Sequence, residues 1–252
     1  MRERHVRLIV AAAVLVSVPA PLAAQRAGHG SHDVPAVDPV GTTAHAQMAG
    51  HIDASAHMRL TAARTPTGDD SARAARIERE LLPVLARYAD VRAAERDGYE
   101  MFAPEVRTQR VYHFTKRSHA LRNSFGFDPA RPTSLLYTRD EAGQLVLSGA
   151  MYTAPARADE DALDERVPLS IARWHLHTNV CVPGRSERAR WAEREDGQMR
   201  FGPAGAIATE EACDAVGGRW RDHVFGWMVH ANLVHTASGP RIEWIDDHRD
   251  GH

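Results

Sequence analysis

Apolar residues recur at helical spacing in the segment 69–97, which gives an expected helix one hydrophobic side and one polar side. Asp69, Asp70 and Ser71 offer caps for its start, and Gly98 offers a stop. Pro83 predicts a kink or a break inside the helix, because proline lacks the backbone N–H that the helical ladder needs. The expected apolar face consists of Ile77, Leu81, Leu82, Val84, Leu85, Tyr88 and Val91.

After Gly98 the pattern changes to short apolar runs separated by turn residues, which is typical of strands. We expect strands over residues 110–115, 134–138, 144–153, 170–182, 224–234 and 241–245, and a short helix over 209–216. Short turns join most of these strands. The sequence therefore predicts an α+β fold, with an N-terminal helix packed on a mainly antiparallel β-sheet and a short helix in the C-terminal half. Residues 69–252 are expected to form this single α+β domain.

The first 24 residues have the composition of a secretory signal peptide. A basic start, MRERHVR, precedes an uncharged apolar run, and Pro19 and Pro21 break that run before small residues follow. Its unbroken apolar core, Leu8–Val18, is too short to cross about 30 Å of hydrocarbon as a helix. We therefore expect residues 1–24 to be cleaved and the protein to be periplasmic or secreted.

Residues 25–68 are expected to form a flexible, histidine-containing linker, because they are rich in small and polar residues and lack a sustained apolar period. Histidine and methionine together suit copper, since thioethers bind Cu(I) and imidazole binds both oxidation states. The segment therefore favours copper over zinc, although a solvated tail with incidental histidines has the same composition. These residues are His29, His32, His45, Met48, His51, His57 and Met58.

Charge and cysteine content narrow the function classes. The chain has a formal net charge of −2, which argues against nucleic-acid or anionic-membrane binding driven by counterion release. No segment after the signal is apolar enough to be a membrane span. Two cysteines in an exported chain favour a disulfide between Cys181 and Cys213, with thiolate ligation of a metal as the alternative. Closing a loop of about 32 residues would stabilise the fold by roughly 3–4 kcal/mol.

Two histidines on one face of an expected strand are the strongest chemical signal. Side chains alternate between the two faces of a strand, so His175 and His177 project in parallel, on the same side as Asn179 and Cys181. Neutral imidazole is a good ligand for zinc and copper. Such a pair can therefore supply two ligands of a metal site.

Histidines from two further strands can complete this site if the strands are neighbours. His230 shares a face with Asn232, and His113 lies on a third expected strand. Asn179 and Asn232 are expected to orient the imidazoles through hydrogen bonds, as metal sites need. Partly buried, hydrogen-bonded structural histidines are the alternative interpretation. The expected ligands are His113, His175, His177 and His230.

Three functions fit these residues. The first is an exported protein that binds or handles copper or zinc. The second is a metal-dependent oxygenase or hydrolase that uses the same histidines around an open coordination position. The third is a metal-free interaction domain stapled by the Cys181–Cys213 disulfide. The sequence places no obvious catalytic carboxylate beside the histidines, which favours binding over catalysis and leaves open whether the protein is an enzyme.

Six segments between about Arg87 and Val234 carry a resemblance to a known family. They are RYADVRAAERDGY, VYHFT, FDPARPTSLLY, WHLHTNVCVP, ATEEACDAVGGRW and FGWMVH. On these segments the chain resembles an uncharacterised family of secreted bacterial single-domain proteins with WHxHxNxC and GWMVH motifs. The resemblance implies export and a single domain, and it carries no activity. Phe114 departs from the tyrosine that often ends the family's Tyr-His-Tyr motif.

Overall fold

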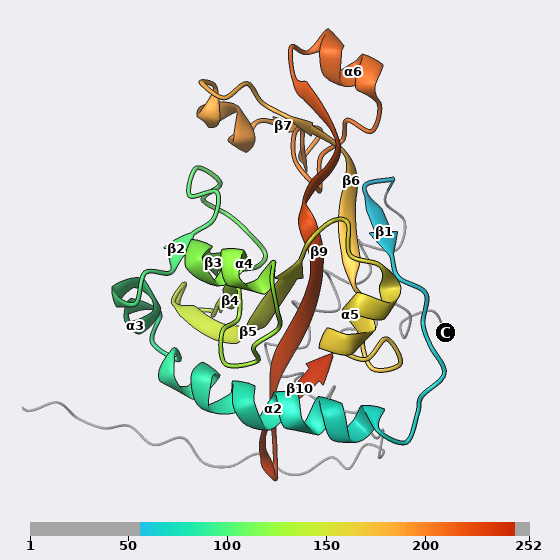
Figure 1. The fold of residues 1–252 in the computed structure, drawn as a ribbon. Helices are drawn as coiled ribbons and strands as arrows, with labels where there is room; N and C mark the ends of the chain where they lie inside the picture. The colour runs from blue at the N-terminus through green and yellow to red at the C-terminus, as the bar shows by residue number, and fades with distance from the viewer. Residues whose placement is uncertain (1–55, 245–252) are drawn as a thin grey trace, which may run out of the picture. The chain divides into compact units, whose positions relative to one another are not determined.

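The structure, a computed structural model, describes residues 56–244. Its centre is an antiparallel sheet with the strand order β1-β6-β9-β5-β4-β3-β2, and β10 also pairs with β9 (Figure 1). A separate hairpin consists of β7 (Arg194–Glu195) and β8 (Gln198–Met199). The strands of the main sheet are β1 (Met58–Leu60), β2 (Glu100–Met101), β3 (Tyr112–Thr115), β4 (Ser134–Arg139), β5 (Leu145–Ala154), β6 (His175–Val182), β9 (Arg219–Thr236) and β10 (Gly239–Trp244).

Strand β9 is 18 residues long and pairs with three other strands. Along one edge β5 pairs with residues 227–232. Along the other edge β6 pairs with residues 219–228, and β10 pairs with residues 231–236. The long strand therefore holds together parts of the chain that are far apart in sequence, and in Figure 1 it runs lengthwise down the middle of the ribbon from the end near α6.

A bulge interrupts the pairing of β6 with β9. His175 pairs with Met228, but His177 pairs with Val224, so β9 contains extra residues between these two rungs. Phe225 lies in the bulge and has a φ of +64°, an unusual conformation for a bulky residue. A bulge bends its strand and increases the local twist, so β9 changes direction beside the two histidines of β6.

Helix α2 packs its apolar stripe into the main hydrophobic core. Ile77, Leu81 and Leu85 follow one another at intervals of four residues and are all buried. The backbone N–H of Ile242 in β10 donates to Glu78 Oε1 at 2.9 Å, which joins the helix to the sheet. Within residues 56–244 the α-helices are α2 (Asp70–Arg87), α3 (Val91–Arg96), α4 (Arg117–Asn123), α5 (Glu160–Arg166) and α6 (Glu210–Ala215).

The expected helix over 69–97 is divided, but not at the proline. Pro83 lies inside α2, where buried residues on both sides of it hold the helix against the core. The break comes at residues 88–90 instead, because the Asp90 side chain accepts from the Arg92 backbone N–H at 2.9 Å and caps a new helix. Gly98 follows α3 with a φ of +83°, as a helix stop requires.

Strand β1 corrects the predicted boundary between linker and domain. The sequence predicts a linker up to residue 68, but Met58–Leu60 pair with β6. Thr61 is fully buried, and its Oγ1 accepts from the Trp174 backbone N–H at 3.1 Å. This pairing depends on a strand more than a hundred residues away, which local composition does not reveal. The predicted signal peptide and the linker up to residue 55 lie outside the described residues.

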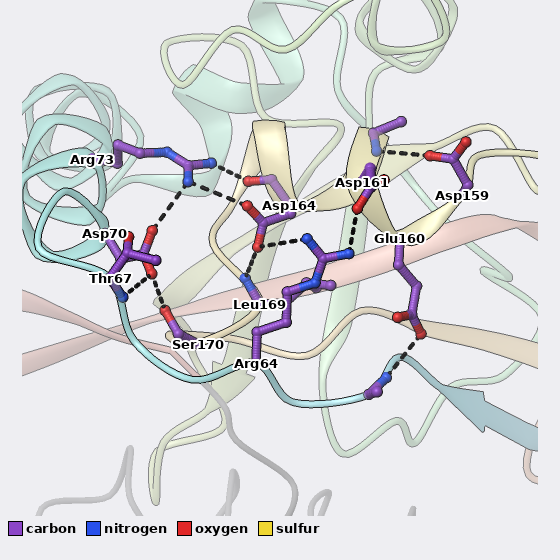
Figure 2. Close-up of polar contacts among 12 residues, drawn as sticks. Arg64, Thr67, Asp70, Arg73, Asp159, Glu160, Asp161, Asp164, Leu169 and Ser170 are labelled. Carbon is purple, nitrogen blue, oxygen red and sulfur yellow. Dashed lines mark hydrogen bonds and ion pairs between the residues drawn. The ribbon is translucent and has the colours of Figure 1, made fainter.

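An ionic and hydrogen-bonded network fixes the chain between β1 and α2 against α5 (Figure 2). The backbone N–H of Ala62 donates to Glu160 Oε1 at 2.9 Å, and Asp161, in the acidic first turn of α5, pairs with Arg64 of this segment. The side-chain pairs are Arg64–Asp161 at 2.5 Å, Arg73–Asp164 at 3.3 Å and Asp70–Ser170 at 2.7 Å. These contacts position the start of α2, and hence its apolar stripe.

The predicted disulfide between Cys181 and Cys213 is present, with Cα atoms 5.5 Å apart. It joins β6 to α6, and both cysteines are buried in a small cluster with Phe201 and Ile207. Gly218 lies against both sulfur atoms, where an added Cβ would collide with them. The bond therefore anchors the loop between β6 and β9. It also removes both cysteines from the possible thiolate ligands of a metal.

The α+β class with a mainly antiparallel sheet is confirmed. The predicted strand over 170–182 begins only at His175, because residues 168–172 form a turn in which Ala172 N–H donates to the Pro168 carbonyl at 3.0 Å. The short helix predicted over 209–216 is α6, capped by the Thr209 side chain. Across residues 56–244, no helix is both long enough and apolar enough to cross a membrane.

Candidate functional site

The four predicted histidines lie together in the structure. The ring centroids of His175 and His177 in β6 are 5.2 Å apart, and His175 lies 5.0 Å from His230 in β9. His113 in β3 adds a fourth ring, with its centroid 6.0 Å from that of His230. We call this group the histidine cluster.

The strand alternation places the histidine cluster on one face of the sheet. In β9, Trp227, Val229 and Ala231 belong to the main hydrophobic core, so Met228 and His230 project from the opposite face. The other strands divide in the same way. We call the side of the main sheet that contacts α2 the core face and the opposite side the histidine face. The buried residues of the histidine face include Leu136, Met151, His175, Met228, His230 and Asn232.

The sheet curves towards the histidine face. Strands β4 and β5 lie between β3 and β9, and neighbouring strands are about 4.8 Å apart, so a flat sheet would separate His113 from His230 by roughly 14 Å. Their ring centroids are only 6.0 Å apart, which requires both curvature and inward-leaning side chains. Gly149 in β5 assists, because the Ala231 carbonyl fills the space that a Cβ would need. The cluster thus depends on a long-range property of the sheet.

Burial keeps three of the rings neutral at pH 7. Desolvation lowers the pKa of His113 and that of His177 to about 4, from an ordinary value of 6.5. Desolvation also lowers the pKa of His175 well below that value, and the neighbouring His177 and His113 lower it further. Neutral imidazole is the form that binds metal ions, so these rings need no deprotonation before binding.

His177 has one ring nitrogen engaged and one without a partner. A hydrogen bond to the backbone of His57 raises the pKa of His177, against the larger effect of desolvation. Its Nδ1 is buried and has no hydrogen-bond partner among the described residues, so the bond to His57 falls to the other nitrogen. This division of roles is the one that metal-ligating histidines adopt: one nitrogen donates to the protein and the other faces the ion.

The two asparagines expected to orient imidazoles have different surroundings. Asn179 is exposed and has a φ of +55°; its side chain donates to the Ala56 carbonyl at 2.8 Å, and its own carbonyl contacts His57 Nδ1 at 2.7 Å. Asn179 therefore holds His57 and the start of β1. Asn232 is buried on the histidine face, and its Oδ1 has no partner within residues 56–244. Asn232 is thus the asparagine with an acceptor available to the cluster.

The spacing of the rings, more than their present orientation, fits a shared ion. Imidazoles that bind one ion at about 2.0–2.1 Å have ring centroids roughly 5 Å apart. The two pairs that His175 forms, at 5.2 and 5.0 Å, have this separation. Among the described side chains, no group of three His, Cys, Asp or Glu residues already has the geometry to hold an ion. Ion binding here therefore requires the rings to rotate about their side-chain torsions.

Three methionines beside the cluster were not predicted. Met58 pairs with His177, Met228 with His175, and Met151 with His230, each directly across a strand ladder. Only Met58 was noted in the sequence, as part of the linker. The two-residue spacing of Met228 and His230 was a visible signal of a shared face. The rung that joins Met151 to His230 could not be known before strand neighbours and register were known.

An apolar pocket of about 220 Å³ lies next to the bulge in β9. Val224, one of its lining residues, is the cross-strand partner of His177. Phe102 and Phe225 meet edge to face in the pocket wall, with ring centroids 5.4 Å apart, and both are exposed. The clustered histidines are not among the residues that line the pocket, and the link between the two is the pairing of Val224 with His177.

The histidines at positions 29, 32, 45 and 51, which were expected to favour copper, lie outside the described residues. The structure therefore places only His57 and Met58 of that segment, and both contact the strand that carries His175 and His177. Comparison of the chain with family models, with curated proteins and with solved structures gave no match. The function must therefore be inferred from the residues and their geometry.

Proposed function

We propose that this protein binds a transition-metal ion, copper or zinc, through the histidine cluster, and that it does so as an exported protein. The observation that carries the proposal is the partnerless, buried Nδ1 of His177 beside two further buried imidazoles. A buried polar atom without a hydrogen bond costs about 1–3 kcal/mol, which a bound ion would recover. His113 supplies the fourth ligand in this proposal, and the side-chain oxygen of Asn232 accepts a hydrogen bond from one of the imidazole rings.

Ion binding is best tested by comparing histidine variants of the full chain. The His177→Ala variant is expected to hold one ion fewer per chain than the wild type, measured by elemental analysis after loading with Zn²⁺ or Cu²⁺ and removal of free metal. The difference between variants matters, because histidines elsewhere in the chain also bind metal weakly. The disulfide and the circular-dichroism spectrum should stay unchanged.

A matched control separates this site from incidental binding by surface imidazoles. His223 and His235 are exposed residues of the same strand, β9, so His223→Ala and His235→Ala should keep the wild-type metal content. Equal metal content in the wild type and in His177→Ala would overturn the proposal. The histidine cluster would then hold no ion, and the third function, an interaction domain stapled by the Cys181–Cys213 disulfide, would be favoured.

A second function, metal-dependent oxygenase or hydrolase chemistry, is favoured by one observation. The apolar pocket is walled by Val224, which forms a rung with His177, so an apolar substrate in the pocket would lie beside the cluster. Metal-loaded protein can be screened for oxygen consumption with phenols and for hydrolysis of aryl esters. Activity that is lost in both His177→Ala and Phe225→Ala, but not in Phe125→Ala at an exposed site, would support this function.

A further inference from the structure

Three of the four clustered histidines, His175, His177 and His230, each have a methionine directly opposite them in a strand ladder; His113 has Leu136. The rungs are Met58–His177 between β1 and β6, Met228–His175 between β9 and β6, and Met151–His230 between β5 and β9. Directly paired residues project from the same face of a sheet, with Cβ atoms about 4.5–5.5 Å apart. Three thioethers therefore border the three imidazoles.

Packing alone does not account for methionine at these positions. Strand interiors favour β-branched and aromatic residues, and valine, isoleucine or leucine would fill the same space. The chain has 7 methionines, and three of them lie on the six strand rungs that contain a clustered histidine; the other three rungs have Leu60, Val224 and Leu136 opposite the histidine. Met151 and Met228 are buried in one small apolar group, separate from the main core. Their sulfur atoms thus lie in the same desolvated layer as the imidazoles.

We infer that the ion of the histidine cluster is Cu(I) and that Met58, Met151 and Met228 supply thioether ligands to it. This inference rests on the proposed metal-binding function and names the metal and its further ligands. Thioethers are soft ligands that select Cu(I), whereas Zn²⁺ takes thiolate, imidazole and carboxylate ligands. A set of neutral imidazoles and thioethers adds no negative charge, which suits a monovalent ion in a buried layer.

The position of Met58 indicates where an ion would enter the site. β1 is at the edge of the sheet, and Met58 is half-buried, whereas Met151 and Met228 are buried. An ion arriving from solvent therefore meets Met58 and its partner His177 first. The buried Met151 and Met228 then complete the coordination of the ion. Replacement of Met58 is expected to slow copper uptake more than it weakens equilibrium binding.

The test compares Cu(I) and Zn²⁺ affinity in methionine variants of the full chain. Cu(I) affinity is measured anaerobically by competition with bicinchoninate, and Zn²⁺ affinity by competition with a fluorescent zinc chelator. Met228→Leu and Met151→Leu are expected to weaken Cu(I) binding at least tenfold and to leave Zn²⁺ binding within about twofold. Met101→Leu is the matched control, because Met101 is a half-buried strand methionine that packs against the main core.

Unchanged Cu(I) affinity in both Met228→Leu and Met151→Leu would overturn the inference while the histidine-dependent binding stands. Absence of histidine-dependent binding of either ion would overturn the proposed function and the inference with it. If a leucine variant fails to fold, X-ray absorption spectroscopy of the Met48→Leu chain, labelled with selenomethionine and loaded with Cu(I), decides the question. The Met48→Leu change removes the linker methionine at position 48 from the signal. Copper–selenium scattering supports thioether ligation, and a shell of nitrogen alone contradicts it.

Discussion

Both faces of the main sheet are buried, yet they are built from different kinds of residue. The core face contains large aromatic and aliphatic side chains, among them Trp174 and Tyr152, and α2 packs against it. The histidine face contains imidazole, thioether, amide and hydroxyl groups with few large apolar residues. A sheet that served only stability would have no reason to bury so many polar groups. The difference indicates that the core face holds the fold, and it is the reason why we place the proposed metal binding on the histidine face.

Truncation on the core face should produce the largest effect. Trp174 is fully buried, so Trp174→Ala is expected to lower the free energy of unfolding by about 3–5 kcal/mol through lost burial and the remaining cavity. Denaturant unfolding of the metal-free protein measures this. Phe125→Ala, at a side chain with 85 % exposure, should change stability by less than about 0.5 kcal/mol. A similar loss of stability in both variants would contradict the conclusion that the core face holds the fold.

Removal of the disulfide tests a third region, in which β6 and β9 continue beyond the histidine cluster. Replacing Cys181 and Cys213 by Ala together is expected to cost about 3–4 kcal/mol, because the bond closes a loop of 32 residues. Thermal unfolding with and without reductant measures the effect. Reductant should lower the stability of the wild type by a similar amount and leave the double variant unchanged. Metal content should be the same in both proteins, and its loss in the variant would mean that the bond supports the cluster.

The elements that local pattern determines were predicted well. Alternation placed His175 and His177 together on one side of β6, and Thr209 with the following acidic turn marked α6. These signals depend on residues within a few positions of one another. The cap at Asp90 was missed because Pro83 is the stronger local signal, although tertiary packing overrides it.

The arrangement of the candidate site was only partly predictable. That His230 and His113 would come near β6 depended on strand order and on the curvature that brings β3 towards β9. The pairing of methionines with histidines depended on the register of the strands. A shift of one residue would have moved these side chains to the opposite face of the sheet. Met58 was assigned to the linker because a three-residue edge strand has too few positions to produce a pattern. Long-range pairing, and not composition, decides these features.

A conservative change on the histidine face should separate stability from binding. His175→Leu replaces a buried imidazole by an apolar side chain, which is expected to change the unfolding free energy of the metal-free protein by less than about 1.5 kcal/mol. The same variant should lose the bound ion, measured by elemental analysis. Added metal should then raise the unfolding temperature of the wild type and not that of the variant. A loss of stability as large as that of Trp174→Ala would mean that the histidine face is an ordinary part of the core.

The smallest effect is expected at the edge of the core face, where Asp70 holds the start of α2. Its carboxylate accepts from the Thr67 backbone N–H at 2.8 Å and from Ser170 Oγ at 2.7 Å, and these hydrogen bonds, with the nearby Arg73, lower its pKa from 3.8 to about 2. Because the folded protein holds the carboxylate in its charged form, the stabilisation is complete above about pH 4 and is lost as the pH falls towards 2. The stability difference between the wild type and Asp70→Asn should therefore shrink over that range, measured by denaturant unfolding at each pH. Asp69→Asn is the control, since Asp69 is exposed and its side chain makes no cap hydrogen bond. A difference that stays constant from pH 5 to pH 2 would mean that Asp70 acts through packing and not through its charge.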